Sequence, residues 1–216
     1  TGFFFRPSIN WSDVSTSAFG VRVSPKGFAF DGRGASMFCD DNIRFYLTAL
    51  LASKFTTYIL NVLNPTLTFN IENVAAVPVV INLNKKEIVD FLTENNISFA
   101  KDDWDSFETS WDFQRHPLLQ HAVFTPQMVA KEEANGYLTM NGIADAYRHW
   151  EQVCNERFNQ LKANEEELNR IFIDIYGLQD ELTPEVADKD VTVRKADLGR
   201  DIRSFISYAV GCMFGR

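Results

Sequence analysis

The chain has 216 residues, of which 45% are hydrophobic and 23% charged, with a formal net charge of −8 at pH 7. This composition is typical of a globular protein with one ordinary or two small domains, and it argues against a uniformly basic nucleic-acid binder. The first 60 residues nevertheless carry six Lys or Arg against four acidic residues, whereas the remainder carries 15 against 25. The front therefore allows contact with DNA, and the acidic remainder would repel it.

The cysteines and the apolar runs indicate the class of environment. Cys39, Cys154 and Cys212 form no CxxC pair, which argues against a disulfide framework or a zinc site and favours free thiols in a reducing compartment. No apolar run approaches the roughly 18 residues of a membrane span, so we expect a cytoplasmic protein with no membrane partner. The chain starts at Thr1 and stops at Arg216 directly after an apolar run, and we expect a piece of a longer protein.

Residues 2–31 are predicted to be rich in β-strand. Residues 19–23 alternate between apolar and polar positions as in a half-buried strand, and residues 24–27 form a tight turn with Pro at its second position. Residues 28–30 are predicted to continue the chain on the far side of that turn as another strand. The Gly-Arg-Gly loop at 32–34 lacks the Lys-Ser/Thr of a P-loop and is interpreted as a turn with one solvated arginine.

The stretch from residue 40 to residue 81 is predicted to be a helix followed by two short strands. Apolar residues at three-and-four spacing between 43 and 62 predict one long helix with a broad buried face. Asp40 or Asp41 can cap its start, and Asn64-Pro65 ends it because proline has no N–H to donate. Residues 67–69 and 77–81 are strand-like, and the proline in the second places it at a sheet edge or strand start.

The middle of the chain is predicted to be a surface helix and a loop. The helix spans Asn84–Asn96, and residues 97–119 are interpreted as a loop whose aromatic rings pack while its carboxylates face water. These carboxylates do not fit an EF-hand, because the glycine bend and the twelfth-position Glu are missing, and no metal is expected: Asp102, Asp103, Asp105, Glu108 and Asp112. His116 is interpreted as a packing and turn residue. His121 and His149 lie far from it in the chain without a nucleophile motif, which argues against a catalytic triad.

The last third is predicted to be helical. Residues 141–176 carry an apolar stripe of helical period, with Asn141 as the cap and Gly177 just past the end. Glu165–Glu167 is interpreted as a solvated face. Residues 198–214 carry a second apolar face and are a candidate antiparallel partner of the long helix.

A closure of Asn-Ile, spaced hydrophobic residues and proline follows the first helix at residues 70–78. With that helix it resembles the target-recognition half of DNA methyltransferases and restriction specificity subunits. Three later stretches are more specific: residues 103–118 (DWDSFETSWDFQRHPL), 161–186 (LKANEEELNRIFIDIYGLQDELTPEV) and 207–216 (SYAVGCMFGR). Together with the first 38 residues they resemble the PglX family of adenine-specific DNA methyltransferases from BREX phage-defence systems, and related restriction enzyme methylase subunits.

The resemblance implies a parent enzyme that transfers a methyl group from S-adenosylmethionine to adenine N6, with its cofactor site and Asn-Pro-Pro-Tyr motif upstream. Here the sole Asn-Pro, Asn64-Pro65, is followed by Thr66-Leu67 and lacks the Pro and Tyr of that motif. This fragment is therefore expected to bind no cofactor and to have no catalytic residue of its own. We expect an α+β fold in three parts: a target-recognition-like lobe (1–82), a connector with short helices and an aromatic-acidic loop (83–140), and a long-helix hairpin or bundle (141–216).

The function implied is target recognition, or specificity, in a restriction-modification or phage-defence methyltransferase, with double-stranded DNA as the partner. Four basic side chains of the front lobe would contact phosphates or guanine edges: Arg6, Arg22, Lys26 and Arg33. The alternative is a protein–protein interaction module, in which the acidic residues 100–216 dock other defence-system subunits or a second copy. A nuclease is disfavoured because Asp188-Lys189-Asp190 has the wrong order for a PD-(D/E)xK pair.

Overall fold

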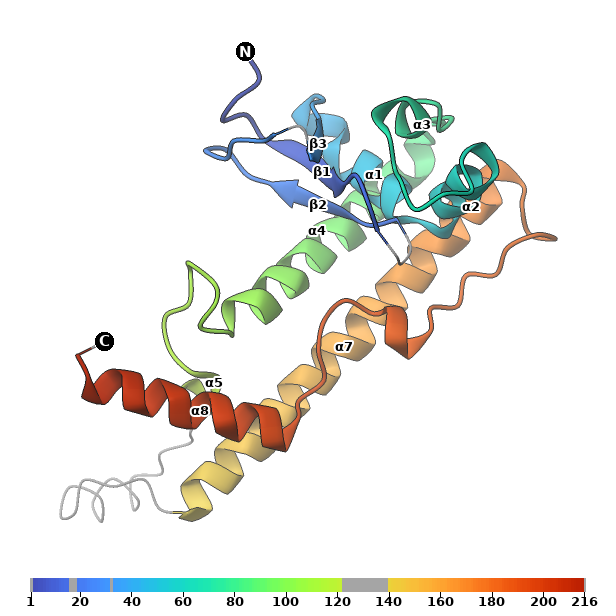
Figure 1. Ribbon diagram of the computed structural model, residues 1–216. Helices are drawn as coiled ribbons and strands as arrows, with labels where there is room; N and C mark the ends of the chain where they lie inside the picture. Colours follow the sequence, from blue (N-terminus) through green and yellow to red (C-terminus); the bar gives the residue numbers. More distant parts are fainter. Residues whose placement is uncertain (1, 16–18, 32, 122–139, 216) are drawn as a thin grey trace. The chain divides into compact units, whose positions relative to one another are not determined.

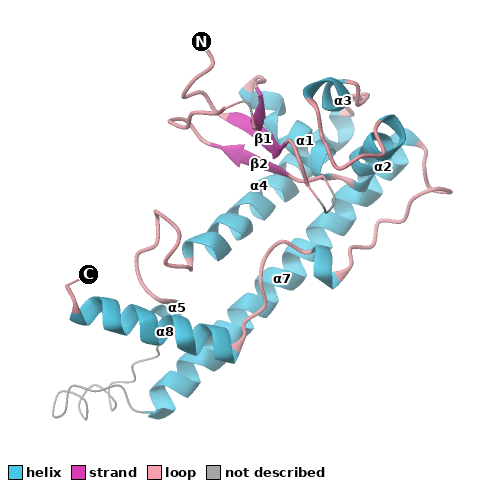
Figure 2. Ribbon diagram, viewed as in Figure 1, coloured by secondary structure: helices cyan, strands magenta, loops and turns pink. Residues whose placement is uncertain are grey.

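The computed structural model describes residues 2–15, 19–31, 33–121 and 140–215 (Figure 1). The fold is α+β, as predicted: an antiparallel sheet near the N-terminus is followed by helices (Figure 2). The contacts divide the chain into two compact units, which we call unit 1 (Thr1–Ile97 with Lys162–Asp188) and unit 2 (Ser98–Leu161 with Lys189–Arg216). Two long helices supply residues to both units. The predicted three-part division at residues 82 and 140 stays a prediction.

The sheet of unit 1 has the order β2-β1-β3, with β1 (Ser8–Ser12) at its centre. Both neighbours, β2 (Val21–Ser24) and β3 (Gly34–Met37), pair antiparallel to it. The predicted strand around residues 19–23 is therefore confirmed as β2. The strand predicted at 28–30 is wrong, and β3 begins later, after a turn in which Asp31 accepts the backbone N–H groups of Arg33 and Gly34. A turn held by one side chain leaves no periodic signal in the sequence.

The helix predicted between residues 43 and 62 is two helices, α1 (Asp41–Ala52) and α2 (Lys54–Leu63). Ser53 between them is extended, and its hydroxyl donates to the Leu50 carbonyl and accepts from the Thr56 N–H, which caps α2. The apolar spacing continues across this break, so the periodicity cannot reveal it. The predicted stop at Asn64 is confirmed, because Asn64 is the C-cap of α2.

The two strands predicted after this helix are wrong. A short helix, α3 (Ile71–Ala75), occupies the closure, and Thr68 forms an isolated bridge with Val14 instead of a strand. Residues 77–81 form no strand. Two tyrosines hold them: Tyr46 Oη donates to the Val80 carbonyl at 2.9 Å, and Tyr176 Oη donates to the Pro78 carbonyl at 2.7 Å.

Two long helices follow, α4 (Leu83–Asp105) and α7 (Met140–Tyr176). The predicted end of α4 at Asn96 is wrong. Asparagine costs a helix interior only about 0.7 kcal/mol, and Asn96 accepts a 2.8 Å hydrogen bond from Asn164 of α7 within unit 1. The long helix predicted at 141–176 is confirmed, and Gly177 ends it with φ of 66°. The side chain of Asn141, the predicted cap, lies outside the described residues.

The core of unit 1 joins the apolar face of the sheet to α1, α2 and the last turns of α7. Ile9 and Trp11 of β1 are buried in it, and Tyr46 meets Phe172 edge-on at 5.5 Å between ring centroids. Phe55 stacks on Tyr176 at 3.6 Å, and the Lys54 N–H donates to Asn169 across 115 residues of chain. This burial orients the opposite, polar face of the sheet outward.

Unit 2 contains α5 (Pro117–Gln120) and α8 (Leu198–Met213), reached after the short 3-10 helix η1 (Asp188–Asp190). His116 is confirmed as a packing and turn residue: it is 3% exposed, caps α5 and lies 5.3 Å from the Phe205 ring. The first turns of α8 pack on α7, where Trp150 Nε1 donates to Asp201. Its far half leaves the expected apolar face open, since Ile206, Val210 and Met213 are exposed.

Within the described residues, no helix combines the length and the apolarity that a bilayer crossing requires.

Candidate nucleic-acid interface

The two faces of the sheet differ because its residues alternate in side. Ile9 and Trp11 point into the core, so Asn10 points to the other face, and the register places Arg22 and Ser36 opposite it on the two neighbouring strands. Asn10 Nδ2 donates to Ser36 Oγ at 2.6 Å and to Ser8 Oγ at 3.2 Å. The outer face thus carries a half-buried amide and the half-buried Ser36 hydroxyl beside the exposed Arg22, whereas Ser8 is buried.

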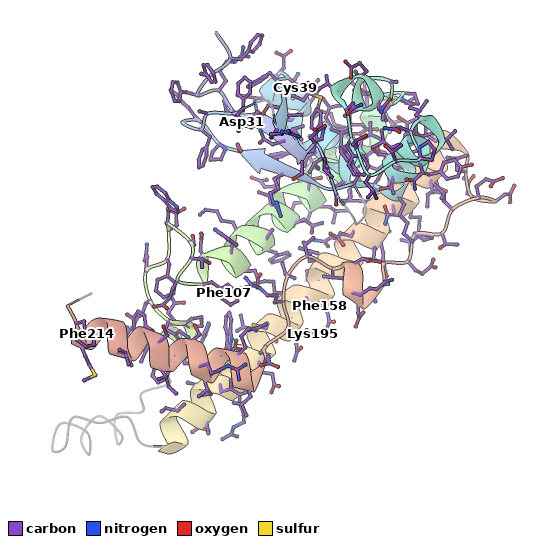
Figure 3. All side chains as sticks on the ribbon, viewed as in Figure 1. Asp31, Cys39, Phe107, Phe158, Lys195 and Phe214 are labelled. Atoms are coloured by element: carbon purple, nitrogen blue, oxygen red, sulfur yellow. The ribbon has the colours of Figure 1, made fainter. Side chains whose placement is uncertain are left out.

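A shallow hollow of about 360 Å³ lies beside Asn10 and is bordered by residues 29–31 and Gly34. Asp31 stands at its rim, labelled in Figure 3. The backbone N–H groups of Gly34 and Arg33 hold the pKa of the Asp31 carboxyl below its usual value. Asp31 therefore stays ionised while it closes the turn that starts β3.

The four predicted DNA-contacting residues all lie in or beside this sheet. Arg6 and Lys26 are at one end, because the backbones of their neighbours are paired: the Phe5 N–H donates to the Phe28 carbonyl at 3.1 Å, and the Gly27 N–H donates to the Phe5 carbonyl at 3.0 Å. The Arg6 guanidinium lies over the Phe3 ring at 5.4 Å. The structure therefore brings these two cations together.

The other two residues lie further along the sheet. Arg22 is exposed on β2 at the level of Asn10. Arg33 lies beyond the opposite end of β1, where its side chain is 86% exposed and 3.9 Å from the Asp13 carboxylate. An ion pair this open contributes little and leaves the guanidinium available. Five residues of antiparallel strand separate the two ends, about 17 Å at 3.4 Å per residue.

An aromatic cluster at the Arg6 end of the sheet was not predicted from the sequence. Phe3, Phe30 and Phe38 meet at ring distances of 5.0 and 5.3 Å, and Phe4 packs on Phe30 at 5.0 Å. Phe5 and Phe28 lie beside this cluster with most of their surface exposed. The run Phe3-Phe4-Phe5 ahead of Arg6-Pro7 was the available signal, because three adjacent phenylalanines cannot all point into one core.

The basic residues of unit 2 are used differently. Asp103 is buried, 3.3 Å from Arg194 Nε and 3.8 Å from Arg157 Nη1. The Arg194 guanidinium also lies 3.3 Å from the centre of the Phe107 ring, and Lys195 Nζ lies 4.2 Å from the Phe158 ring. These cations, in the part of Figure 3 where Phe107, Phe158 and Lys195 are labelled, are engaged within the unit.

The acidic-aromatic stretch at 97–119 differs from its prediction. Asp103 is buried instead of solvated, and the Trp111 side chain is fully exposed instead of packed. Asp105 and Asp112 pair with Lys101, and this raises the pKa of the lysine. Among the described residues no three His, Cys, Asp or Glu side chains converge in a way that could hold a metal ion.

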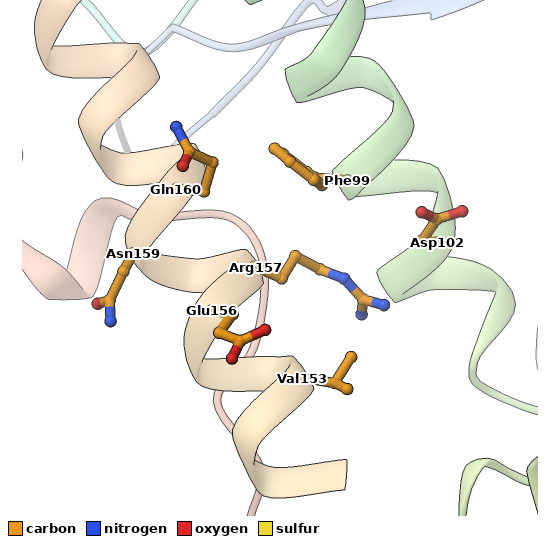
Figure 4. Close-up of a pocket in the computed structure, with 7 residues that line it drawn as sticks. All are labelled: Phe99, Asp102, Val153, Glu156, Arg157, Asn159 and Gln160. Carbon is orange, nitrogen blue, oxygen red and sulfur yellow. The ribbon is translucent and has the colours of Figure 1, made fainter. Parts of the chain in front are cut away.

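A groove of about 700 Å³ lies between the end of α4 and α7 in unit 2 (Figure 4). Asp102 and Glu156 line it with Arg157, whose guanidinium reaches from α7 toward α4. Mixed charge of this kind offers no excess of positive potential to a nucleic acid.

In unit 2, His121 is partly buried and Cys154 is fully buried. His121 and His149, distant in the chain, meet with ring centroids 5.1 Å apart, and burial lowers the pKa of His121. Burial raises the pKa of the Cys154 thiol to about 12, so it stays protonated at neutral pH and is a poor nucleophile.

No protein-family profile matches the chain. Over 215 residues, 99% of its length, the chain is 45% identical to the adenine-specific methyltransferase PglX of Lacticaseibacillus casei (strain Zhang). It is 28% identical over 234 residues to the adenine-specific methyltransferase BrxX of Escherichia coli O9:H4 (strain HS). The chain spans 17% of the length of each of these relatives.

The chain is therefore related to a portion of adenine-specific methyltransferases. The resemblance to PglX that the sequence predicted is confirmed by this identity.

Proposed function

We propose that this chain is the DNA target-recognition region, with a helical spacer, of an adenine-specific DNA methyltransferase. The observation that carries the proposal is the sheet with its flanking turns, where four accessible cations lie around the hydrogen-bonded Asn10. The chain would read double-stranded DNA for a PglX-like enzyme of a restriction-modification or BREX phage-defence system.

Each part of the face has a role in this proposal. Arg6, Lys26 and Arg33, at the two ends of the sheet, contact phosphates and set the register of the duplex. Arg22, between them, reaches base edges, because arginine pairs with guanine through two hydrogen bonds. The Asn10 amide is bonded to Ser8 and Ser36 and fixes the strands beside Arg22. The separation of about 17 Å corresponds to roughly five base pairs at 3.4 Å per step.

Methyl transfer belongs elsewhere in this proposal. Asn64 caps α2, and its Nδ2 donates to the Thr68 carbonyl at 3.0 Å. A side chain committed to its own turn is a helix stop and presents no catalytic amide to a flipped adenine. S-adenosylmethionine would accordingly be bound by another part of the parent enzyme.

The test uses the whole methyltransferase that contains these residues, with Arg22→Ala and Arg33→Ala combined. We expect DNA affinity and methylation to fall, most clearly at elevated salt, and the slope of log affinity against log salt to flatten by about 0.9 for each lost phosphate contact. The control, Lys85→Ala with Arg203→Ala, removes two exposed charges that belong to helices and not to the sheet or its loops. Wild-type methylation by the Arg22/Arg33 variant at elevated salt would refute the assignment.

A second candidate function is protein docking by unit 2. It is favoured by the open apolar face of α8, beyond which Phe214 is also exposed (Figure 3). In this proposal the face binds another subunit of the defence system or a second copy. Substituting Ile206 and Val210 with Ser should weaken co-purification of that partner and leave DNA affinity unchanged. DNA affinity that depended on unit 2 and not on the sheet would refute both candidates.

A further inference from the structure

We propose that Phe5 and Phe28 form an aromatic wedge that inserts against the base stack of DNA, with Arg6 and Lys26 on the flanking phosphates. This inference rests on the proposed function and assigns a distinct role to one end of the same sheet. These two phenylalanines are not among the residues that the sequence predicted to contact DNA.

The geometry of the pair is set by the backbone. The Phe5 N–H donates to the Phe28 carbonyl, and the Gly27 N–H donates to the Phe5 carbonyl, so the two aromatic residues lie on adjacent, cross-linked segments. Each side chain is 59% exposed. Two rings are thus held at the rim of the sheet by main-chain hydrogen bonds and not by burial.

The conformation of Phe5 is unusual. Its φ is 66°, and it is the only non-glycine residue with positive φ among the described residues. A bulky aromatic side chain is disfavoured there, whereas glycine would adopt this conformation freely. The ring gains little burial in return, its nearest ring partner being Phe4 at 6.2 Å. Strain that holds an exposed ring is typical of a residue kept for contact with a ligand.

The positive charges beside Phe5 and Phe28 favour a nucleic acid as the ligand. Arg6 and Lys26 follow and precede the two paired residues, and both are exposed. The nearest carboxylate along these segments, Asp31, accepts two backbone N–H groups in its own turn, and Asp13 lies at the far end of β1 beside Arg33. An apolar ring pair between two cations complements stacked bases between phosphates better than it complements a protein core.

The chemistry of the proposed enzyme supplies a use for such a wedge. An enzyme that modifies a base must take it out of the stack, and apolar side chains inserted between base steps unstack and kink the duplex. A wedge at the rim of the recognition face would open the duplex beside the site being read.

The test compares two 30-base-pair duplexes of the same mixed sequence, one fully paired and one with a central mismatch beside a 2-aminopurine. Unstacking costs less at a mismatch, so the wild-type methyltransferase should bind the mismatched duplex about tenfold more tightly and change the 2-aminopurine fluorescence on binding. Phe5→Gly should bring this preference close to one while affinity for the paired duplex falls less than about threefold. Phe28→Ala should have the same effect without altering the Phe5 backbone.

The controls separate the wedge from folding and from general DNA binding. Phe5→Gly relieves the positive φ, so its melting temperature should equal or exceed that of the wild type. Arg6→Ala with Lys26→Ala should weaken binding to both duplexes equally.

The outcomes are distinguishable. An equal affinity of the wild type for both duplexes, with no effect of Phe5→Gly, overturns the wedge and leaves the proposed function standing. Absence of DNA binding by the wild type overturns both. Loss of a protein partner from the Phe5→Gly and Phe28→Ala variants, with the mismatch preference intact, assigns the rings to protein docking and also overturns the wedge.

Discussion

The two units of this protein differ in how they use basic side chains. In unit 1 the cations around the sheet are exposed, and the one ion pair among them, Arg33 with Asp13, is open and long. In unit 2, Arg157 and Arg194 surround the buried carboxylate of Asp103. Accessible charge, and not the number of charges, therefore distinguishes a surface that can bind a polyanion from one that stabilises a fold.

The largest expected effect is on the buried charge of unit 2. Replacing Asp103 with Ala leaves two arginines without their carboxylate, and we expect the free energy of unfolding to fall by about 3 kcal/mol. Urea denaturation measures this loss. Asp112→Ala is the matched control, because its carboxylate is exposed and its pairing with Lys101 contributes less than about 1 kcal/mol. Equal effects of the two substitutions would contradict the contrast between the units.

Acid should destabilise unit 2 before unit 1. All three histidines belong to unit 2, and burial lowers the pKa of His116 to about 4 from the 6.5 of an unfolded chain. The folded state therefore keeps the imidazole neutral, and its contribution is fully present above pH 6.5 and is lost as the pH falls toward 4. We expect a loss of about 2 kcal/mol by pH 4.5.

Hydrogen exchange can locate that loss. Amides of α5 and α8 should lose protection between pH 6.5 and 4.5, while those of the sheet hold. His116→Asn keeps an acceptor for the α5 cap and removes the titration, so its stability should depend less on pH over this range. An unchanged pH dependence in this variant would exclude His116 as the cause.

The smallest expected effect comes from replacing one arginine in each unit with alanine. It tests the difference between the two units most directly. Arg22→Ala should weaken binding to the recognised DNA site by about three- to fivefold, and leave stability within about 0.5 kcal/mol of the wild type. Arg194→Ala should do the reverse, with lower stability and unchanged DNA affinity, because its guanidinium pairs with Asp103. Fluorescence anisotropy across a salt series and urea denaturation measure the two effects on both variants.

The sequence predicted best where one local signal is enough. The helix over 141–176 was correct because its apolar period persists for ten turns and Gly177 ends it. The stop at Asn64-Pro65 was correct because proline lacks an N–H. The strand around 21–23 followed from simple alternation.

The errors arose where distant residues decide the local structure. Residues 77–81 have the side chains of a strand, but two tyrosines bind their carbonyls and no neighbouring strand pairs with them. Asn96 was expected to end α4, but Asn164 of α7 satisfies its amide. The break at Ser53 is a local exception, because it depends on a cap formed with Leu50 and Thr56 that the apolar spacing does not show.

The candidate site shows the same division. The sequence by itself determined the fold class, the long helix and the relation to adenine-specific methyltransferases, because periodicity, composition and identity are properties of the chain alone. Only the tertiary structure decided that Arg6 and Lys26 meet at one end of a sheet, that Asn10 faces outward between Arg22 and Ser36, and that Phe5 is held strained beside Phe28. Strand register and backbone hydrogen bonds between distant segments set these positions, and neither leaves a pattern in the order of the residues.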